Sequence, residues 1–180
     1  EPFNYNLKCC SPAVDAGNPS FALDPDGTVS DIGAYYYDQS AMDYCENIWY
    51  VSETGDDSLG DGSESNPFGT IQYAVDFACT GDTVKILPGT YNENIVCTRS
   101  LSLIGEGEES KIVANKFLGP AIDINNASEA TYGQISDLCI NGNGRETGIR
   151  ISSNDSSKWI VSNNHIDSTS YGILIYKDSV

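Results

Sequence analysis

The chain has 180 residues, of which 26 are Asp or Glu and 9 are Lys or Arg, so its formal net charge is −17. This balance argues against nucleic acid and other polyanions as partners, because phosphate binding needs clustered basic side chains. No apolar run is long enough for a membrane span, and no signal peptide is recognisable. The chain begins at Glu1 without Met, as expected of a processed mature chain or of a piece of a longer one.

Residues 1–40 contain three turn-rich motifs. They read CSPAVDAGNP over Cys10–Pro19, DPDGT over Asp24–Thr28 and DIGAY over Asp31–Tyr35. Together they resemble a segment usually found at the C-terminal end of bacterial and archaeal β-helix proteins. Here the segment comes first in the chain. We therefore expect an N-terminal segment over 1–40, a linker over 41–47 and a main domain over 48–180.

The main domain opens with motifs in a recognisable order. An aromatic strand and acidic loop (Tyr50–Asp57) precede NPFGTI (Asn66–Ile71), which is followed by GDTV (Gly81–Val84) and PGTY (Pro88–Tyr91). This order is similar to the N-terminal entry of pectin-lyase-like proteins. The resemblance implies a right-handed parallel β-helix that is secreted or displayed on the cell surface.

A short amphipathic helix is predicted near residues 70–79. Thr70 is suited to cap its start, and Gly81 to end it. Such a helix would cover the first coil of a β-helix, which otherwise exposes apolar core and strand edge. The residues that recur at helical spacing on its apolar face are Ile71, Ala74, Val75 and Ala78.

The second half of the chain carries a weak internal repeat. The segments AIDI (Ala121–Ile124), GIRI (Gly148–Ile151) and GILI (Gly172–Ile175) lie at offsets of 27 and 24. A period near 25 residues favours an all-β solenoid in which Ile122, Ile149 and Ile173 stack above one another. The alternative is an antiparallel sandwich, with Asn143-Gly144 as a hairpin turn.

Calcium is the predicted ligand, because it takes hard oxygen ligands on flexible turns. One group of candidate ligands brackets a Pro/Gly turn and the other lines a Gly-rich loop, although neither fits the EF-hand pattern. In the alternative interpretation these carboxylates cap turns through hydrogen bonds to backbone N–H groups. The candidates are Asp24, Asp26, Asp31, Asp56, Asp57 and Asp61.

The six cysteines lack the paired spacing of a zinc site, so disulfides are expected, with Cys139 either bridged or a free buried thiol. His165 is the only histidine and is expected in a turn or on the surface. The aromatic residues around the linker would pack a junction or stack on a sugar. The remaining cysteines are Cys9, Cys10, Cys45, Cys79 and Cys97; the aromatic residues are Tyr35, Tyr36, Tyr37, Tyr44, Trp49 and Tyr50.

These observations predict an extracellular or cell-surface structural module without catalysis, which assembles end to end. The partner is either a second copy, giving a filament, or a neighbouring β-helix domain in a tandem array. In the filament the N-terminal segment would supply apolar side chains to the next copy. The alternative is a carbohydrate-active protein: a polysaccharide lyase or hydrolase, or a glycan-binding module. The apolar side chains are those of Val14, Phe21, Leu23, Ile32 and Tyr35.

Overall fold

The computed structural model describes residues 13–14, 16–25, 27–33, 35, 47–115, 119–126, 131–153 and 156–177. The chain divides into two compact units, Glu1–Cys45 and Glu46–Val180. The division falls within residues 41–47, of which only Asn47 is described, so the linker stays a prediction. Over the described ranges, no helix has both the length and the apolar character needed to cross a membrane.

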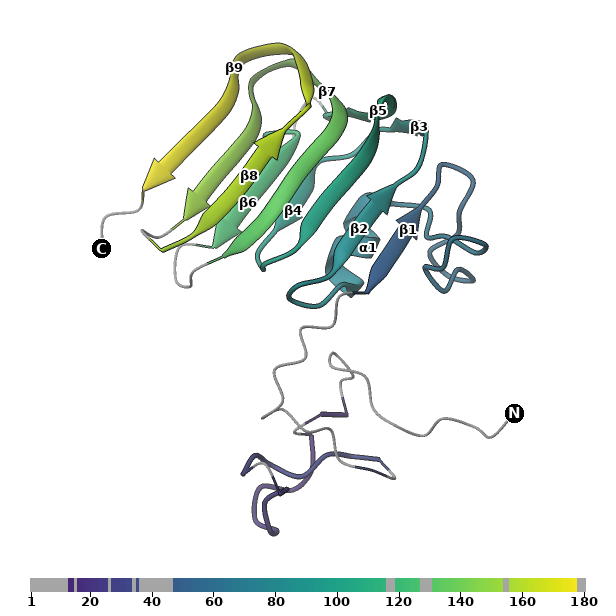
Figure 1. Ribbon diagram of the computed structural model, residues 1–180, viewed down its shortest axis with the longest axis vertical. Helices are drawn as coiled ribbons and strands as arrows, with labels where there is room; N and C mark the ends of the chain where they lie inside the picture. Colours follow the sequence, from purple (N-terminus) through teal and green to yellow (C-terminus); the bar gives the residue numbers. More distant parts are fainter. Residues whose placement is uncertain are drawn as a thin grey trace. The chain divides into compact units, whose positions relative to one another are not determined.

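The second unit is built on one nine-stranded sheet, in which every pairing between strands is parallel. Figure 1 shows that this sheet curls into a half-barrel. The elements are β1 (Ile48–Val51), α1 (Ile71–Phe77), β2 (Thr83–Ile86), β3 (Gly89–Tyr91), β4 (Ile95–Cys97), β5 (Ser102–Val113), β6 (Ile122–Asn126), β7 (Tyr132–Ser153), β8 (Lys158–Ser162) and β9 (His165–Lys177).

Three parallel ladders make up the curled sheet. The first joins β1, β2, the start of β5, the start of β7 and β8. The second joins β3, the end of β5, the middle of β7 and the start of β9. The third joins β4, β6 and the ends of β7 and β9. Because β5, β7 and β9 each belong to more than one ladder, these long strands bend and give the sheet its curl.

The repeat places like side chains in register. Ile122 pairs with Ile149, and Ile149 pairs with Ile173, so the predicted row at offsets of 27 and 24 is confirmed. In-register parallel pairing sets side chains of equivalent residues above one another on one face of the sheet. A second row two residues further along contains Ile124, Ile151 and Ile175.

The antiparallel alternative is wrong, because the strands that flank the repeat run parallel. Asn143 and Gly144 lie inside β7 with φ angles of 51° and 76°. There the left-handed backbone bends one strand and does not return it as a hairpin. The bend is held by the Asn143 side chain, whose Nδ2 donates to the carbonyl of Ala114 at 3.1 Å.

The helix α1 closes the core at the β1 end of the curl. The Thr70 hydroxyl accepts a hydrogen bond from the N–H of Tyr73 at 3.3 Å, as predicted for the N-cap. The helix ends at Phe77, before the predicted Gly81, which has a φ of 95° in the following turn. α1 packs against β1, β2 and β4 through its predicted apolar face.

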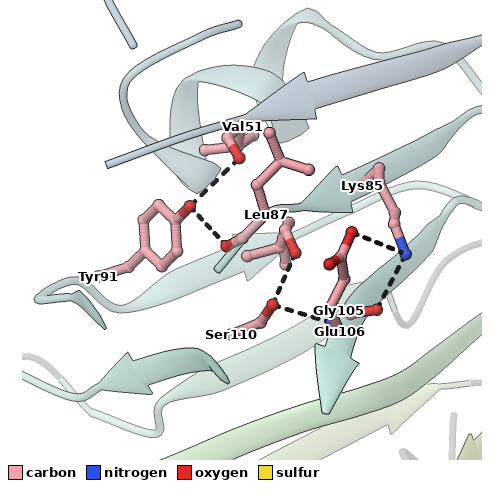
Figure 2. A network of polar contacts seen from close by, with 8 residues as sticks. Val51, Lys85, Leu87, Tyr91, Gly105, Glu106 and Ser110 are labelled. Atoms are coloured by element: carbon pink, nitrogen blue, oxygen red, sulfur yellow. Dashed lines mark hydrogen bonds and ion pairs between the residues drawn. The ribbon is translucent and has the colours of Figure 1, made fainter. Parts of the chain in front are cut away.

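Tyr91, at the end of β3, ties neighbouring turns of the chain together. Its hydroxyl lies 2.9 Å from the carbonyl oxygen of Leu87 and 3.2 Å from that of Val51 (Figure 2). Burial raises the pKa of Tyr91 to about 12, and the negative charges of Glu53 and Glu93 contribute to the rise. The hydroxyl therefore remains protonated, and able to donate, well above neutral pH.

A bulge in β5 shifts its register against β7 and is held by polar contacts. The fully buried Ser110 hydroxyl donates to the carbonyl of Ile86 at 2.8 Å and accepts from the N–H of Glu106 at 2.9 Å (Figure 2). Lys85 Nζ donates to the carbonyl of Gly105 at 3.1 Å. The bulge is thus fixed to β2.

Candidate functional site

The first group of predicted calcium ligands forms part of a turn. Asp24 Oδ2 accepts a hydrogen bond from the N–H of Asp31 at 3.0 Å, and Asp24 N–H donates to the carbonyl of Thr28 at 3.0 Å. Asp26 lies outside the described residues. The Asp24 carboxylate therefore holds the two ends of this turn together.

The second group serves three different turns. Asp56 Oδ1 accepts from the N–H of Ser58 at 2.7 Å, and Asp61 Oδ1 accepts from that of Ser63 at 2.9 Å. Hydrogen bonds from Ser63 lower the pKa of Asp61. Asp57 accepts from the N–H of Gly69 at 2.7 Å and caps the start of α1.

These contacts agree with the alternative interpretation, in which the aspartates cap turns. In the part of the chain that the structure describes, no group of three or more His, Cys, Asp or Glu side chains is arranged to hold a metal ion. Calcium binding stays a prediction.

A buried carboxylate organises the β1 end of the molecule. Asp82 is fully buried, and its Oδ2 accepts from Trp49 Nε1 at 2.7 Å and from the N–H of Cys79 at 2.8 Å. Its Oδ1 accepts from the N–H of Asn47 at 3.0 Å. The GDTV motif contains this residue, but no local pattern predicts its indole partner, which lies 33 residues earlier in the chain. Because every contact is within the fold, Asp82 has a structural role.

Aromatic rings cover the same end. Trp49 packs edge-on against Phe77 with ring centroids 4.8 Å apart, and Phe68 lies 5.1 Å from Phe77 and 5.0 Å from Tyr73. Of the six aromatic residues predicted to pack a junction or bind sugar, Trp49 is thus placed in the core. We call this region, made of β1, α1 and these rings, the closed end.

The opposite end of the sheet is uncovered. β8 and β9 each pair with β7 on one side, and within the described residues no strand lies on their other side. Ile149 and Ile151 in β7 are 0% and 4% exposed, whereas their register partners Ile173 and Ile175 in β9 are 46% and 66% exposed. We call this region, formed by β8 and β9, the open end.

The open end contains an apolar hollow of about 540 Å³. Trp159 and Val161 of β8 are only partly buried against the core, and the indole Nε1 donates to Thr131 Oγ1 at 3.0 Å. The hollow can therefore take further apolar side chains. It is lined by Ile151, Ser157, Lys158, Trp159, Val161, Ile173 and Ile175.

A polar groove lies along β7 and β9, beside the turn that precedes β6. Arg150 Nε donates to Asp123 Oδ1 at 2.8 Å, and its Nη2 contacts Asp123 Oδ2. This hydrogen bonding raises the pKa of Arg150. Tyr171 and Tyr176 expose their rings beside the pair. The groove, about 610 Å³, is lined by Gly119, Pro120, Gly144, Thr147, Arg150, Tyr171, Leu174 and Tyr176.

The ion pair joins matching positions of successive repeats, which sequence reasoning missed. Asp123 and Arg150 are register partners, each flanked on both sides by the stacked isoleucines. Their spacing of 27 equals the repeat offset, so this signal was present in the sequence. The pair leaves no excess charge at the groove, which suits a neutral polar ligand better than an ion.

The two free thiols among the described residues are not activated. Cys139 and Cys97 are free, buried thiols, and burial raises the pKa of each. They are therefore protonated at neutral pH and poor nucleophiles. Cys79 is disulfide-bonded, and Cys9, Cys10 and Cys45 lie outside the described residues, so the partner of Cys79 stays a prediction. His165 is exposed. Its Nδ1 lies 3.6 Å from Glu108 Oε1, and its Nε2 lies 4.0 Å from Asp167 Oδ2.

Comparison with known proteins gives no relative. No protein family, curated protein or solved structure matches this chain. The open end and the groove are the two features that packing within the unit leaves unexplained. The closed end is accounted for by packing within its own unit.

Proposed function

We propose that this protein is an extracellular structural module that assembles end to end through its open end, without catalysis of its own. The observation that carries the proposal is the contrast within one row of side chains, buried at Ile149 and exposed at Ile173. The exposed side of β9 offers both an apolar face and a strand edge to a further layer.

We also propose that the curled sheet is a right-handed parallel β-helix, as the resemblance to pectin-lyase-like proteins implies. Three ladders with repeats of 27 and 24 residues support this assignment. The hand is supported by a general rule, since crossovers between parallel strands of one sheet are right-handed in about 98% of cases.

Burial of the exposed isoleucines would contribute to association at the open end. Covering a large aliphatic side chain contributes roughly 1.5–3 kcal/mol, and Ile173 and Ile175 retain about half or more of their exposure. Loss of translational and rotational freedom opposes association by at least about 4 kcal/mol. The two isoleucines therefore need the partly buried Trp159 and Val161, and hydrogen bonds along β9, to give a stable contact.

Sedimentation velocity over a wide concentration range tests the proposal. The unaltered chain should form larger species as its concentration rises. A variant carrying Ile173→Lys and Ile175→Lys should remain monomeric, because it places two charges in the apolar contact. Leu59→Lys, the same change at an exposed loop position, is the matched control and should assemble normally. A monomer at every concentration for the unaltered chain would refute end-to-end assembly by a single kind of copy.

Carbohydrate binding is a second candidate function, favoured by the groove around Arg150. Exposed tyrosine rings can stack on sugar rings, while a fixed guanidinium donates to hydroxyl groups. Tyr176→Ala should weaken binding to a glycan array, whereas Tyr132→Ala, a tyrosine of similar exposure outside the groove, should not. Release of unsaturated products from acidic polysaccharides would assign lyase activity in place of the structural role.

A further inference from the structure

We infer that the open end of one copy is covered by residues 13–35 of a second copy. The inference rests on the proposed end-to-end assembly and names the occupant of the contact. It is carried by three features of residues 13–35: the exposed apolar side chains among the described residues, two backbone hydrogen bonds within the segment, and its charge.

Among the described residues of the N-terminal unit, four large apolar side chains are more than half exposed. Phe21 is 71% exposed, and Leu23, Ile32 and Tyr35 are each more than half exposed, while Val14 is partly buried. Exposed apolar groups gathered in so short a segment mark an interaction surface. They match the chemistry of the hollow at the open end, which is lined mainly by aliphatic side chains.

Two backbone hydrogen bonds join parts of this segment that are distant in the sequence. Gly17 N–H donates to the carbonyl of Ser30 at 2.7 Å, and Ile32 N–H donates to that of Ala13 at 2.7 Å. A Cβ on Gly17 would lie 2.2 Å from the Ser30 carbonyl oxygen, so only glycine allows this approach. A segment held in one conformation before binding loses less entropy when it binds.

Charge favours the same pairing. Residues 13–35 include four Asp and no Lys or Arg, whereas residues 145–177 include three basic and three acidic residues besides Arg150, which is paired with Asp123, in a chain of net charge −17. Lys158 lines the hollow itself. An acidic segment is therefore attracted to the least acidic part of its partner, and two open ends have no such attraction for one another.

The closed end is a poorer occupant, although Tyr73 and Phe77 are partly exposed there. The backbone N–H and C=O groups in the middle of a helix bond to one another, so α1 cannot extend the ladders at β9. Irregular backbone such as that of residues 13–35 can add hydrogen bonds along a strand edge. Because the two contacting surfaces differ, the contact is heterologous and continues from copy to copy as a filament.

Two full-length variants test the inference by complementation. The end variant carries Ile173→Lys and Ile175→Lys; the docking variant carries Phe21→Asp and Leu23→Asp. Each change should raise the dissociation constant for self-association about 100-fold or more, since two apolar side chains leave the contact. When the two variants are mixed, the intact segment of the end variant should bind the intact open end of the docking variant. The result should be a 1:1 heterodimer that does not grow, because both remaining surfaces carry the substitutions.

The controls separate this inference from the proposed function. If the unaltered chain stays monomeric, end-to-end assembly itself fails. If the docking variant assembles as the unaltered chain does while the end variant does not, assembly stands and the inferred occupant is wrong. Tyr73→Lys at the closed end should leave assembly unchanged; loss of assembly there would identify α1 as the occupant.

A second measurement keeps the test independent of the folding of the docking variant. A photo-reactive amino acid at Tyr35, in an otherwise unaltered chain mixed with isotope-labelled copies, should crosslink to the peptide 158–177 of a different copy. Crosslinks confined to the same chain, or directed to α1, would overturn the inference.

Discussion

The two ends of the curled sheet differ in how far the core is covered from solvent. At the closed end, α1 and the rings of Trp49 and Phe68 cover the first strands, and the buried Asp82 is fully hydrogen-bonded. At the open end, Ile173 and Ile175 continue buried rows into solvent. The difference is that one end is covered within the unit, whereas the other exposes the same rows of side chains over the described residues.

The largest effect is expected at the closed end from Asp82→Ala. The change leaves Trp49 Nε1 and the N–H of Cys79 buried without an acceptor, and breaking such a buried charged network costs about 3–5 kcal/mol of unfolding free energy. Urea denaturation measures the loss. Asp61→Ala, which removes a solvent-exposed turn cap, is the control and should cost far less. Equal losses would show that Asp82 does not organise this end.

A matched pair in one row compares the ends directly. Ile149→Ala should lower the unfolding free energy of the dilute monomer by about 3 kcal/mol, as for a fully buried residue. Ile173→Ala should cost about 1 kcal/mol, because its side chain is already half in solvent. Thermal or urea unfolding below the assembly concentration gives both values. Similar losses would mean that the open end is covered within the monomer.

A smaller effect is expected from Tyr91 at alkaline pH. Its folded-state pKa of about 12 exceeds the unfolded value near 10, so its contribution is complete below pH 10 and is lost as the pH rises through 12. The loss should reach about 2 kcal/mol of unfolding free energy. Tyr91→Phe should flatten this part of the stability profile, and an unchanged slope would contradict burial of the hydroxyl.

Divalent cations should have the smallest effect. Asp56, Asp57 and Asp61 already accept hydrogen bonds from backbone N–H groups, so calcium can only reinforce a loop that is held without it. Melting curves recorded with Ca²⁺ and with EDTA test the calcium prediction. A rise with Ca²⁺ that Asp56→Asn removes would support it, whereas superimposable curves would refute it.

The sequence predicted the rows of the core because their periodicity is explicit. Ile122, Ile149 and Ile173, which lie at offsets of 27 and 24, are register partners in neighbouring strands. The capping helix could also be predicted, because Thr70 and the apolar spacing after it are local signals. Its early end at Phe77 could not, because it depends on contacts with the strands that follow.

Features set by distant contacts could not be predicted in this way. The burial of Asp82 depends on an indole 33 residues earlier in the chain. The Arg150–Asp123 pair could have been predicted from the sequence, because both residues occupy equivalent places in the repeat. The exposure of Ile173 could not be predicted, because its motif GILI has the same Gly-Ile-x-Ile pattern as the motif GIRI of the buried Ile149.

Hydrogen–deuterium exchange, compared between the dilute and the concentrated chain, tests the difference between the ends most directly. End-to-end assembly predicts that amides of β9 gain protection at high concentration while those of β1 and α1 keep the protection they already have. Unchanged exchange in β9, or a gain confined to β1 and α1, would contradict the account.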